Sequence, residues 1–363
     1  MKNIKFKSVA VTGQDAIRTK YSAVQLGYYN DPFVQFFVQN PRKSQPIMNR
    51  GYFARVYSIE KLILQFLNVS KKIKEKNKEE KKDENFQNVV PQIVSLGSGL
   101  DTTFWRISQD EKFSSFQFRY FEVDLDQVNA KKIDVILKHK ELSSIIGCEE
   151  KNNQKKEEQI EEILHGSKSG FFLDRKNAEI ISSKYSLISG DLCALDSIIE
   201  RMKIHKINFE APTIFFSECS LVYLDPKYSD AIIGWIAKDF HVVFFANYEH
   251  INPNDPFGKR MLLNFEKRNA PLLGIHQYPS LSSQIQRLKD AGFVFAGADD
   301  MLSIYNRFST SDEVDRLVIQ KIQKLEFFDE LEEWNLIMRH YMISWGVKIE
   351  SEFIDLVSEF FHL

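Results

Sequence analysis

Short apolar runs alternate with longer segments of helical periodicity through the middle of the chain. Residues 213–216 (TIFF) and 242–245 (VVFF) contain no charged residue, as expected for strands that are covered on both faces. Alternation of such strands with helices predicts a parallel sheet with helices on both sides, which is an α/β fold. The predicted strands are 92–98, 119–125, 186–189, 212–218, 241–248 and 293–297.

Start and stop signals mark two of the intervening helices. Asp225 is a predicted N-cap, Pro226 follows at the first helical position, and apolar residues recur at helical spacing over 231–236. A second helix is predicted over 282–291, with Gly292 as its C-terminal stop. Both helices lie between predicted strands, which supports the alternating order.

The two ends of the chain show mostly helical patterns. Within the first seventy residues, Asp31-Pro32 opens one predicted helix and Asn49 opens another. The tail is predicted to be helical over 312–346, with a final strand near 340–347.

Two charge-rich segments interrupt the apolar pattern and look like insertions. Residues 71–85 (KKIKEKNKEEKKDEN) carry seven lysines and five acids around one isolated apolar residue, Ile73. Residues 149–162 (EEKNNQKKEEQIEE) are similar in composition. Both segments lack the apolar surface that offsets the entropy of chain ordering, so we expect solvated helix or disorder in each.

Composition disfavours several classes of protein. The chain has 363 residues, with 48 Lys plus Arg against 50 Asp plus Glu, so no excess of positive charge attracts nucleic acid or an anionic membrane. Three widely spaced cysteines fit neither a disulfide framework nor a metal site, and they favour a reducing, cytoplasmic location. No segment has the pattern of a signal peptide or a membrane span. We expect a monomer.

A glycine loop follows the first predicted strand and is a candidate for ligand binding. In the stretch IVSLGSGLDTT (93–103), Gly97 and Gly99 allow the backbone to approach a nucleotide-like ligand. Thr102 stands where a dinucleotide fingerprint has its third glycine, which argues against a bound pyrophosphate. An adenosine ligand without phosphates fits better, and S-adenosylmethionine is the common example. Two glycines separated by one residue are a weak signal when taken alone.

Acidic residues follow three further predicted strands. Asp124 ends the second strand and is expected to accept hydrogen bonds from a ribose. Asp191 and Leu192 follow the third strand and place an acceptor beside an apolar side chain, which suits an adenine ring. Glu218 ends the fourth strand. Because ligands of open parallel sheets bind outside the carboxyl ends of the strands, we expect these residues at one site.

Cations in the N-terminal region are candidates for the amino-acid end of such a cofactor. Its carboxylate needs a positive partner, and Lys20, Arg50 and Arg55 are available. Spacing alone leaves open which of them binds the carboxylate, because each is equally consistent with an exposed surface cation.

No nucleophile for hydrolysis is indicated. The eight histidines show no pairing with a Ser or Cys at a recognisable nucleophile turn. Cys219 lies beside Glu218 in a strand that is expected to be buried, so we interpret it as a packing residue.

Longer motifs resemble those of a known family. The matching segments, in order along the chain, are Lys20 with 27–32 (GYYNDP), 49–55 (NRGYFAR), 96–106 (LGSGLDTTFWR), 121–124 (FEVD), 190–192 (GDL), 218–223 (ECSLVY) and 247–249 (NYE). On these segments the chain resembles the leucine carboxyl methyltransferases, which esterify the C-terminal leucine of the protein phosphatase 2A catalytic subunit. The resemblance covers most of the chain apart from the two charged segments.

The resemblance implies the fold, the cofactor and the roles of particular residues. The implied fold is a Rossmann-like class I S-adenosylmethionine-dependent methyltransferase sheet with helices on both faces, an N-terminal helical segment and a substrate-binding cap. The cofactor is S-adenosyl-L-methionine, and no metal is expected. Arg55 and Tyr223 are implied to lie close to the substrate carboxylate and are the candidate catalytic residues. The expected cofactor-binding residues are Lys20, Arg55, Gly97, Gly99, Asp124, Asp191, Leu192 and Glu218.

On this basis the chain is expected to have four parts. Residues 1–70 form an N-terminal helical segment that contributes to the cofactor and substrate site, and residues 71–90 are a charged insertion. Residues 91–250 form the cofactor-binding core, with a second charged insertion at about 149–180. Residues 251–363 supply the substrate cap and the C-terminal strands and helices that complete the same domain.

The predicted function is methyl esterification of the α-carboxylate of the C-terminal leucine of the protein phosphatase 2A catalytic subunit, whose C-terminal tail is the expected partner. One alternative is the related transfer RNA wybutosine-type carboxyl methyltransferase. Its relatives carry a propeller domain after the catalytic part, whereas this sequence stops at Leu363, and the neutral charge balance disfavours RNA. A second alternative is a non-catalytic phosphatase-binding module, which would have no need to retain the cofactor residues.

Overall fold

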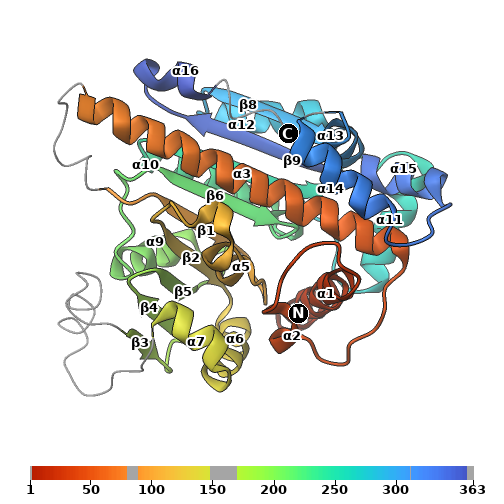
Figure 1. The fold of residues 1–363 in the computed structure, drawn as a ribbon, viewed down its shortest axis with the longest axis horizontal. Coiled ribbons are helices and arrows are strands. Elements are labelled where there is room, and N and C mark those ends of the chain that lie inside the picture. Colours follow the sequence, from red (N-terminus) through yellow and green to blue (C-terminus); the bar gives the residue numbers. More distant parts are fainter. Residues whose placement is uncertain (1, 80–88, 148–169, 311, 358–363) are drawn as a thin grey trace.

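Five parallel strands form the centre of a mixed sheet, and antiparallel strands extend it on both sides (Figure 1). The structure is a computed structural model that describes residues 2–79, 89–147, 170–310 and 312–357. Within these residues the strand order is β3-β4-β5-β2-β1-β6-β7-β9-β8. The strands are β1 (Gln92–Leu96), β2 (Arg119–Asp124), β3 (Phe171–Asp174), β4 (Glu179–Ser182), β5 (Tyr185–Ser189), β6 (Thr213–Glu218), β7 (Val243–His250), β8 (Phe295–Asp300) and β9 (Tyr341–Lys348).

The parallel strands end at the same level along one edge of the sheet. Leu96 at the end of β1 pairs with Val123 on one side and with Ser217 on the other. Farther out, Asp124 pairs with Ser189. Residues that follow these strands are therefore brought together although they lie far apart in sequence.

Alternate residues of the parallel strands face two separate hydrophobic cores. In β1, Ile93 belongs to the core that also contains Phe66 of α3 (Pro46–Glu79), whereas Val94 belongs to the core that contains Ile236 of α10 (Pro226–Asp239). Helices thus cover both faces of the sheet, which explains why the strands are almost continuously apolar. Figure 1 shows the long helix α3 lying across the sheet.

Helices connect the strands and form both ends of the described chain. Those before β5 are α1 (Lys2–Gln25), α2 (Val34–Phe37), α3 (Pro46–Glu79), α5 (Thr103–Gln109), α6 (Asp126–Lys138) and α7 (Lys140–Ile146), with the 3₁₀ turn η1 (Glu111–Phe113). Those after it are α9 (Leu195–Ile204), α10 (Pro226–Asp239), α11 (Pro256–Lys267), α12 (Leu281–Ala291), α13 (Met301–Phe308), α14 (Glu313–Gln323), α15 (Leu331–Arg339) and α16 (Ile354–Val357), with the 3₁₀ turns η2 (Leu221–Tyr223) and η3 (Ser351–Phe353).

The helix signals in the sequence correspond to real helix ends. Asp225 caps α10 by accepting a hydrogen bond from the backbone N–H of Lys227, and Pro226 is the first residue of the helix. Gly292 follows α12 in the left-handed conformation, with φ of 104°. Asn49, in contrast, does not open a helix, because α3 already begins at Pro46. Proline suits the first helical position, and that signal outweighs the Asn in this segment.

The sheet departs from the predicted all-parallel arrangement on both sides. The last strand, β9, lies between β7 and β8 and runs antiparallel to both. On the other side, β3 and β4 form an antiparallel hairpin that was not predicted, and β4 pairs with β5. Residues 170–180 therefore include strand residues rather than insertion, because Phe171 and Ile180 are buried in the core. Residues 149–162 lie outside the described residues.

The lysine-rich segment after residue 70 begins as a helix, one of the two states expected for it, but it also makes buried contacts that were not expected. Helix α3 continues to Glu79 without a break. Ile73 is fully buried in the larger core, so this one apolar side chain anchors the helical turn that carries it. Lys76 donates a hydrogen bond of 2.6 Å to the backbone carbonyl of Glu352 near the end of the described chain. The two contacts explain why this part of the segment packs as helix.

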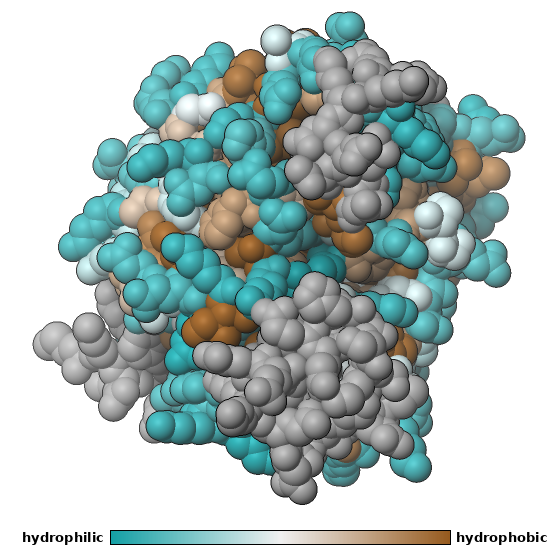
Figure 2. All heavy atoms as spheres, turned by 90° about the vertical axis from the view of Figure 1, so that its left-hand side faces the viewer, coloured by the Kyte–Doolittle hydropathy of each residue, from teal (hydrophilic) through white to brown (hydrophobic). Residues whose placement is uncertain are grey.

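The side of the molecule at the left in Figure 1 faces the viewer in Figure 2. Hydrophilic side chains predominate among the described residues on this face, and hydrophobic side chains occur in small groups. In the described part of the chain, no helix is both long enough and apolar enough to cross a bilayer.

Replacement of Ile73 by Ala is expected to destabilise the protein although the residue lies in a lysine-rich segment. Truncating a fully buried Ile leaves a cavity and costs about 2–5 kcal/mol of unfolding free energy. The exposed neighbour Lys74→Ala serves as the control and is expected to change stability by no more than about 0.5 kcal/mol. Urea denaturation followed by circular dichroism measures both. Equal stability of the two variants would contradict the anchoring role of Ile73.

Candidate active site

A cavity of about 750 Å³ opens at the carboxyl ends of the parallel strands. The residues predicted from the sequence converge on it from α1, α3, the ends of β1, β2, β5 and β6, and the turn η2. All nine line the same cavity: Lys20, Arg55, Gly97, Gly99, Asp124, Asp191, Leu192, Glu218 and Tyr223. The residues at the strand ends share this cavity because the parallel strands end at the same level. The helices α1 and α3 and the turn η2 add Lys20, Arg55 and Tyr223.

The glycine loop needs both of its glycines, for different reasons. Gly97 has φ of 69°, and a Cβ there would lie 2.3 Å from Oγ of Ser220, so a side chain is excluded sterically. Gly99 has φ of 57°, and a Cβ there would meet no atom within 4 Å. Because Gly99 lines the cavity, that open space is where a ligand can approach the backbone.

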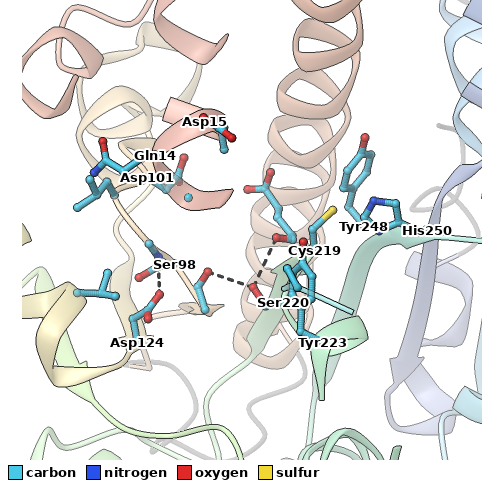
Figure 3. A pocket seen from close by; sticks show the side chains of 18 of the residues that line it. Gln14, Asp15, Ser98, Asp101, Asp124, Cys219, Ser220, Tyr223, Tyr248 and His250 are labelled. Carbon is cyan, nitrogen blue, oxygen red and sulfur yellow. Dashed lines mark hydrogen bonds between the residues drawn. The ribbon is translucent and has the colours of Figure 1, made fainter. Parts of the chain in front are cut away.

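Asp124 holds this loop in addition to facing the cavity (Figure 3). Its Oδ2 accepts a hydrogen bond of 2.6 Å from the backbone N–H of Gly99, and its Oδ1 accepts one of 2.7 Å from Leu125. Burial raises the pKa of Asp124, while these two hydrogen bonds favour the ionised form. A carboxylate has about four acceptor positions, so two remain for a ligand.

The acid after β5 is held in a similar way. Asp191 lies in the turn before α9, and its Oδ1 accepts a hydrogen bond of 2.9 Å from the backbone N–H of Cys193. Leu192 lines the cavity beside it. The turn therefore presents one carboxylate and one apolar side chain to the same space, as the sequence predicted.

The predicted cations do not stand alone but form a buried cluster with two carboxylates. Nζ of Lys20 lies 2.6 Å from Oδ1 of Asp101 and 3.9 Å from Oε2 of Glu218. Arg55 forms an ion pair with Glu218. The four side chains retain only 7–12% of their exposure. Two positive and two negative charges cancel within the cluster.

Mutual pairing keeps the charges of this cluster in place. Burial alone would lower the pKa of Lys20, but Asp101 and Glu218 outweigh it and raise the pKa. Burial would raise the pKa of Asp101, but Lys20 outweighs it and holds the pKa below its usual range. Burial opposes the charge on Arg55 as well, and Glu218 raises its pKa well above the ordinary value. The cluster is thus suited to a ligand that itself carries one ammonium and one carboxylate.

Asp101 was not predicted as a site residue. It lies in the DTTFWR motif directly after the glycine loop, and that position is the signal that points to it. Arg50, the third candidate cation, does not line the cavity. Its guanidinium carbon lies 3.9 Å from the ring centre of Phe328.

An aromatic wall extends the cavity beyond Cys219, where Figure 3 shows Tyr248 and His250. Tyr248 and His250 lie at the end of β7, and Tyr341 lies at the start of β9. The guanidinium carbon of Arg55 is 4.9 Å from the ring centre of Tyr248. Burial lowers the pKa of His250 to about 3, so its ring is neutral and the wall carries no charge of its own. The sequence assigned no role to His250, although its strand-end position is the same signal that identified Glu218.

Cys219 lines the cavity next to Glu218 in a conformation that is unusual for its residue type, with φ of 53°. Burial raises the pKa of its thiol to about 12. A thiol of that pKa stays protonated at neutral pH, whereas catalytic cysteines act as thiolates. The environment therefore supports packing rather than nucleophilic chemistry.

The residues present fit an adenosyl amino acid. The acids at the strand ends suit its ribose and adenine, and the open space at Gly99 lets it approach the backbone. The neutral cluster of charges suits its zwitterionic end. No group of His, Cys, Asp and Glu that could hold a metal ion occurs among the described residues.

The sheet and the cavity first define a class of protein. Parallel strands in the order β5-β2-β1-β6-β7, with antiparallel β9 between β7 and β8, form the Rossmann-like sheet expected for a class I S-adenosylmethionine-dependent methyltransferase. The glycine loop and the acids lie at the carboxyl edge, where this class binds its cofactor.

Comparison with known proteins identifies the family. The sequence model described as leucine carboxyl methyltransferase matches residues 8–237. The leucine carboxyl methyltransferase 1 homolog of Arabidopsis thaliana is 32% identical over 340 residues, which cover 94% of this chain and 89% of the relative. Leucine carboxyl methyltransferase 1 of Bos taurus is 32% identical over 347 residues, with 95% and 91% covered. The chain belongs to the leucine carboxyl methyltransferase family and uses S-adenosylmethionine.

A second group of relatives is also similar. The tRNA wybutosine-synthesizing protein 4 of Homo sapiens is 28% identical over 336 residues, which cover 93% of this chain and 43% of that protein. Both groups thus match nearly the whole of this chain.

Cys219 is expected to resist alkylation at pH 8. Its pKa of about 12, against an ordinary 9.0, leaves roughly 1,000-fold less thiolate at that pH, and the thiolate fraction rises only as the pH approaches 12. The variant Cys148→Ser/Cys193→Ser isolates this thiol for iodoacetamide labelling followed by mass spectrometry. The same protein unfolded in guanidinium is the control and should label fully. Labelling of the folded protein at the rate of free cysteine would show that the thiol is ionised.

Proposed function

We propose that this protein transfers a methyl group from S-adenosylmethionine to the α-carboxylate of the C-terminal leucine of the protein phosphatase 2A catalytic subunit. The observation that carries the proposal is the neutral cluster of two cations and two carboxylates, in one cavity with Tyr223 and the glycine loop. Relatives that match almost the whole chain are named leucine carboxyl methyltransferases, which supports a leucine carboxylate as the methyl acceptor.

The position of each residue along the sheet edge suggests how the cofactor lies. Asp191 and Leu192 after β5 are assigned to the adenine, and Asp124 after β2 to the ribose. The backbone at Gly97 and Gly99 lies between them and the charged cluster. Lys20 and Arg55 then face the carboxylate of the amino-acid end, with Glu218 and Asp101 available to its ammonium.

The substrate carboxylate needs no activation by a base. A C-terminal carboxyl group has a pKa of about 3.3–3.7, so it is already an anion at neutral pH. When bound, S-adenosylmethionine supplies a sulfonium-linked methyl group that such an anion attacks in line. The task of the protein is to position the carboxylate and to exclude water, and positioning alone supplies much of the barrier reduction.

Arg55 and Tyr223 are assigned to orient the substrate carboxylate. They reach the cavity from α3 and η2, on the side where the aromatic wall begins. The negative charge of the carboxylate is lost as the ester forms, so an ion pair that is too strong would stabilise the ground state and slow the transfer. The ion pair with Glu218 weakens the attraction of Arg55 for the substrate carboxylate, because Glu218 already compensates part of the positive charge of Arg55.

The alternative as a transfer RNA wybutosine-type carboxyl methyltransferase is supported by the human relative at 28% identity. The balance of 48 basic and 50 acidic residues offers no general attraction for a polyphosphate, and the relatives named for leucine methylation are more similar. We therefore place the protein substrate first. We further infer a cytoplasmic monomer in which residues 1–70 contribute to the site and residues 251–363 supply the substrate cap.

Transfer of labelled methyl from S-adenosylmethionine to the phosphatase catalytic subunit is expected only when its terminal leucine is present. The matched control is the same subunit without that leucine, and calorimetry with S-adenosylmethionine alone tests cofactor binding separately. Label that appears regardless of the leucine would overturn the substrate. Cofactor binding without any transfer would favour the non-catalytic module.

Tyr223→Phe is expected to lower kcat/KM for the protein substrate by roughly 10–150-fold, which is the worth of a hydrogen bond to a charged group. Arg55→Lys is expected to have an effect at least as large, because lysine cannot supply the planar fork. Tyr228→Phe is the control, since Tyr228 lines the same cavity but its ring lies against Lys227, 4.8 Å from Nζ. Steady-state kinetics with both substrates measure all three. Undiminished turnover of either site variant would remove that residue from the mechanism.

A further inference from the structure

A fully buried lysine lies directly behind the glycine loop and has no part in the assignment above. Lys132 of α6 and Glu122 of β2 form an ion pair in which both side chains have 0% exposure. Nζ of Lys132 also donates a hydrogen bond of 2.7 Å to the backbone carbonyl of Asp101. Nothing in its local sequence distinguishes this lysine from the exposed Lys131 beside it.

Side chains from two further elements surround the pair, although Oε1 of Glu122 has no hydrogen-bond partner among the described residues. The hydroxyl of Tyr185 in β5 donates a hydrogen bond of 2.9 Å to Oε2 of Glu122. Nζ of Lys132 lies 5.4 Å from the ring centre of Trp105 in α5. A buried pair of this kind adds little net stability compared with apolar residues of similar volume. Stability alone therefore does not account for a charged pair at this place in the core.

The hydrogen bond to Asp101 connects the buried lysine to the charged cluster of the cavity. The carbonyl of Asp101 is held by Lys132, while its Oδ2 accepts a hydrogen bond of 3.1 Å from the N–H of Thr103. With its backbone and one carboxylate oxygen held, Oδ1 is directed at Lys20, 2.6 Å away. Lys20 in turn lies 3.9 Å from Glu218. The position of the Lys20 ammonium thus depends on a residue outside the cavity.

Two side chains hold the glycine loop by hydrogen bonds to its backbone. Asp124 binds the N–H of Gly99 from the end of β2, and Lys132 binds the carbonyl of Asp101 from α6. The charge of Lys132 also favours the ionised forms of Asp101 and Asp124, although Lys20 has the larger influence on Asp101 and burial still leaves the pKa of Asp124 raised. Geometry and charge therefore act in the same direction on this part of the cofactor site.

We propose that Lys132 is a positioning residue that fixes the segment from Gly99 to Asp101 and, through Asp101, the Lys20 ammonium that receives the amino-acid end of the cofactor. This inference rests on the proposed function only for the identity of the cofactor. Lys132 does not touch the cofactor, and its effect is expected on cofactor affinity rather than on the affinity for the protein substrate.

The first experiment separates positioning from stability. Binding of S-adenosylhomocysteine by calorimetry and unfolding in urea are measured for Lys132→Met and for Glu122→Leu/Lys132→Met. We expect Lys132→Met to weaken binding about 10–150-fold and to lower stability, because it leaves Glu122 buried without a partner. The double variant is expected to regain stability, since it leaves no unpaired charge, but to bind as weakly as the single variant.

A matched control removes an ion pair that is remote from the cavity. Lys61 of α3 pairs with the buried Asp315 of α14, and neither residue lines the cavity. Lys61→Met is expected to lower stability while changing S-adenosylhomocysteine binding by less than about twofold. A double variant of Glu122 and Lys132 with wild-type affinity would overturn the proposal. Failure of the wild-type protein to bind S-adenosylhomocysteine would instead overturn the proposed function.

A second experiment does not use the Glu122→Leu/Lys132→Met variant and so does not depend on its folding. Asp101→Asn removes the charge that holds Lys20 and is expected to weaken binding about tenfold or more. If Lys132 acts through Asp101, the combination Asp101→Asn/Lys132→Met should bind no more weakly than the worse single variant. If the loss of affinity in this combined variant equals the product of the two single losses, Lys132 does not act through Asp101. Kinetics should show a higher KM for S-adenosylmethionine with an unchanged KM for the protein substrate, which a merely structural defect would not produce.

Discussion

Buried charges require partners, and this requirement organises the whole site. Lys20, Arg55, Asp101 and Glu218 come from four separate segments of the chain, and each is nearly inaccessible to water. An isolated charge in such a place would be strongly disfavoured, whereas each of these four side chains lies beside a group of opposite charge. The cavity can therefore hold a zwitterion beside the aromatic side chains of Tyr248 and Tyr341. Without this compensation the same cavity would reject both ends of an amino acid.

The sheet provides the frame on which this compensation depends. Parallel strands that end at one level bring the glycine loop, Asp124, Asp191 and Glu218 to a single edge. Helices α1 and α3 bring the two cations to the same cavity. The N-terminal helices and the Rossmann-like sheet therefore line one cavity together.

Positioning extends outward from the cavity in layers. Lys20 is held by Asp101, and Asp101 is held by Lys132, whose charge is balanced by Glu122. A methyl transfer to a carboxylate that is already ionised requires little acid or base chemistry and depends on alignment. A support behind the glycine loop in which each ammonium group contacts a carboxylate is consistent with such a reaction, because errors in position reduce the rate more than any missing proton transfer.

The amino-acid sequence alone determined the parallel strands, the glycine loop and the acids that follow the strands, because each of these is a local pattern that an apolar run and its neighbours reveal. Motifs such as GYFAR also identified the family. Tertiary structure alone decided which charges pair, since Lys20 and Asp101 lie 81 residues apart and Arg55 and Glu218 lie 163 apart. It also decided the place of β9 and the burial of Ile73 and Lys132. A lysine in a helix looks the same whether it faces water or a carboxylate, and only packing makes the difference.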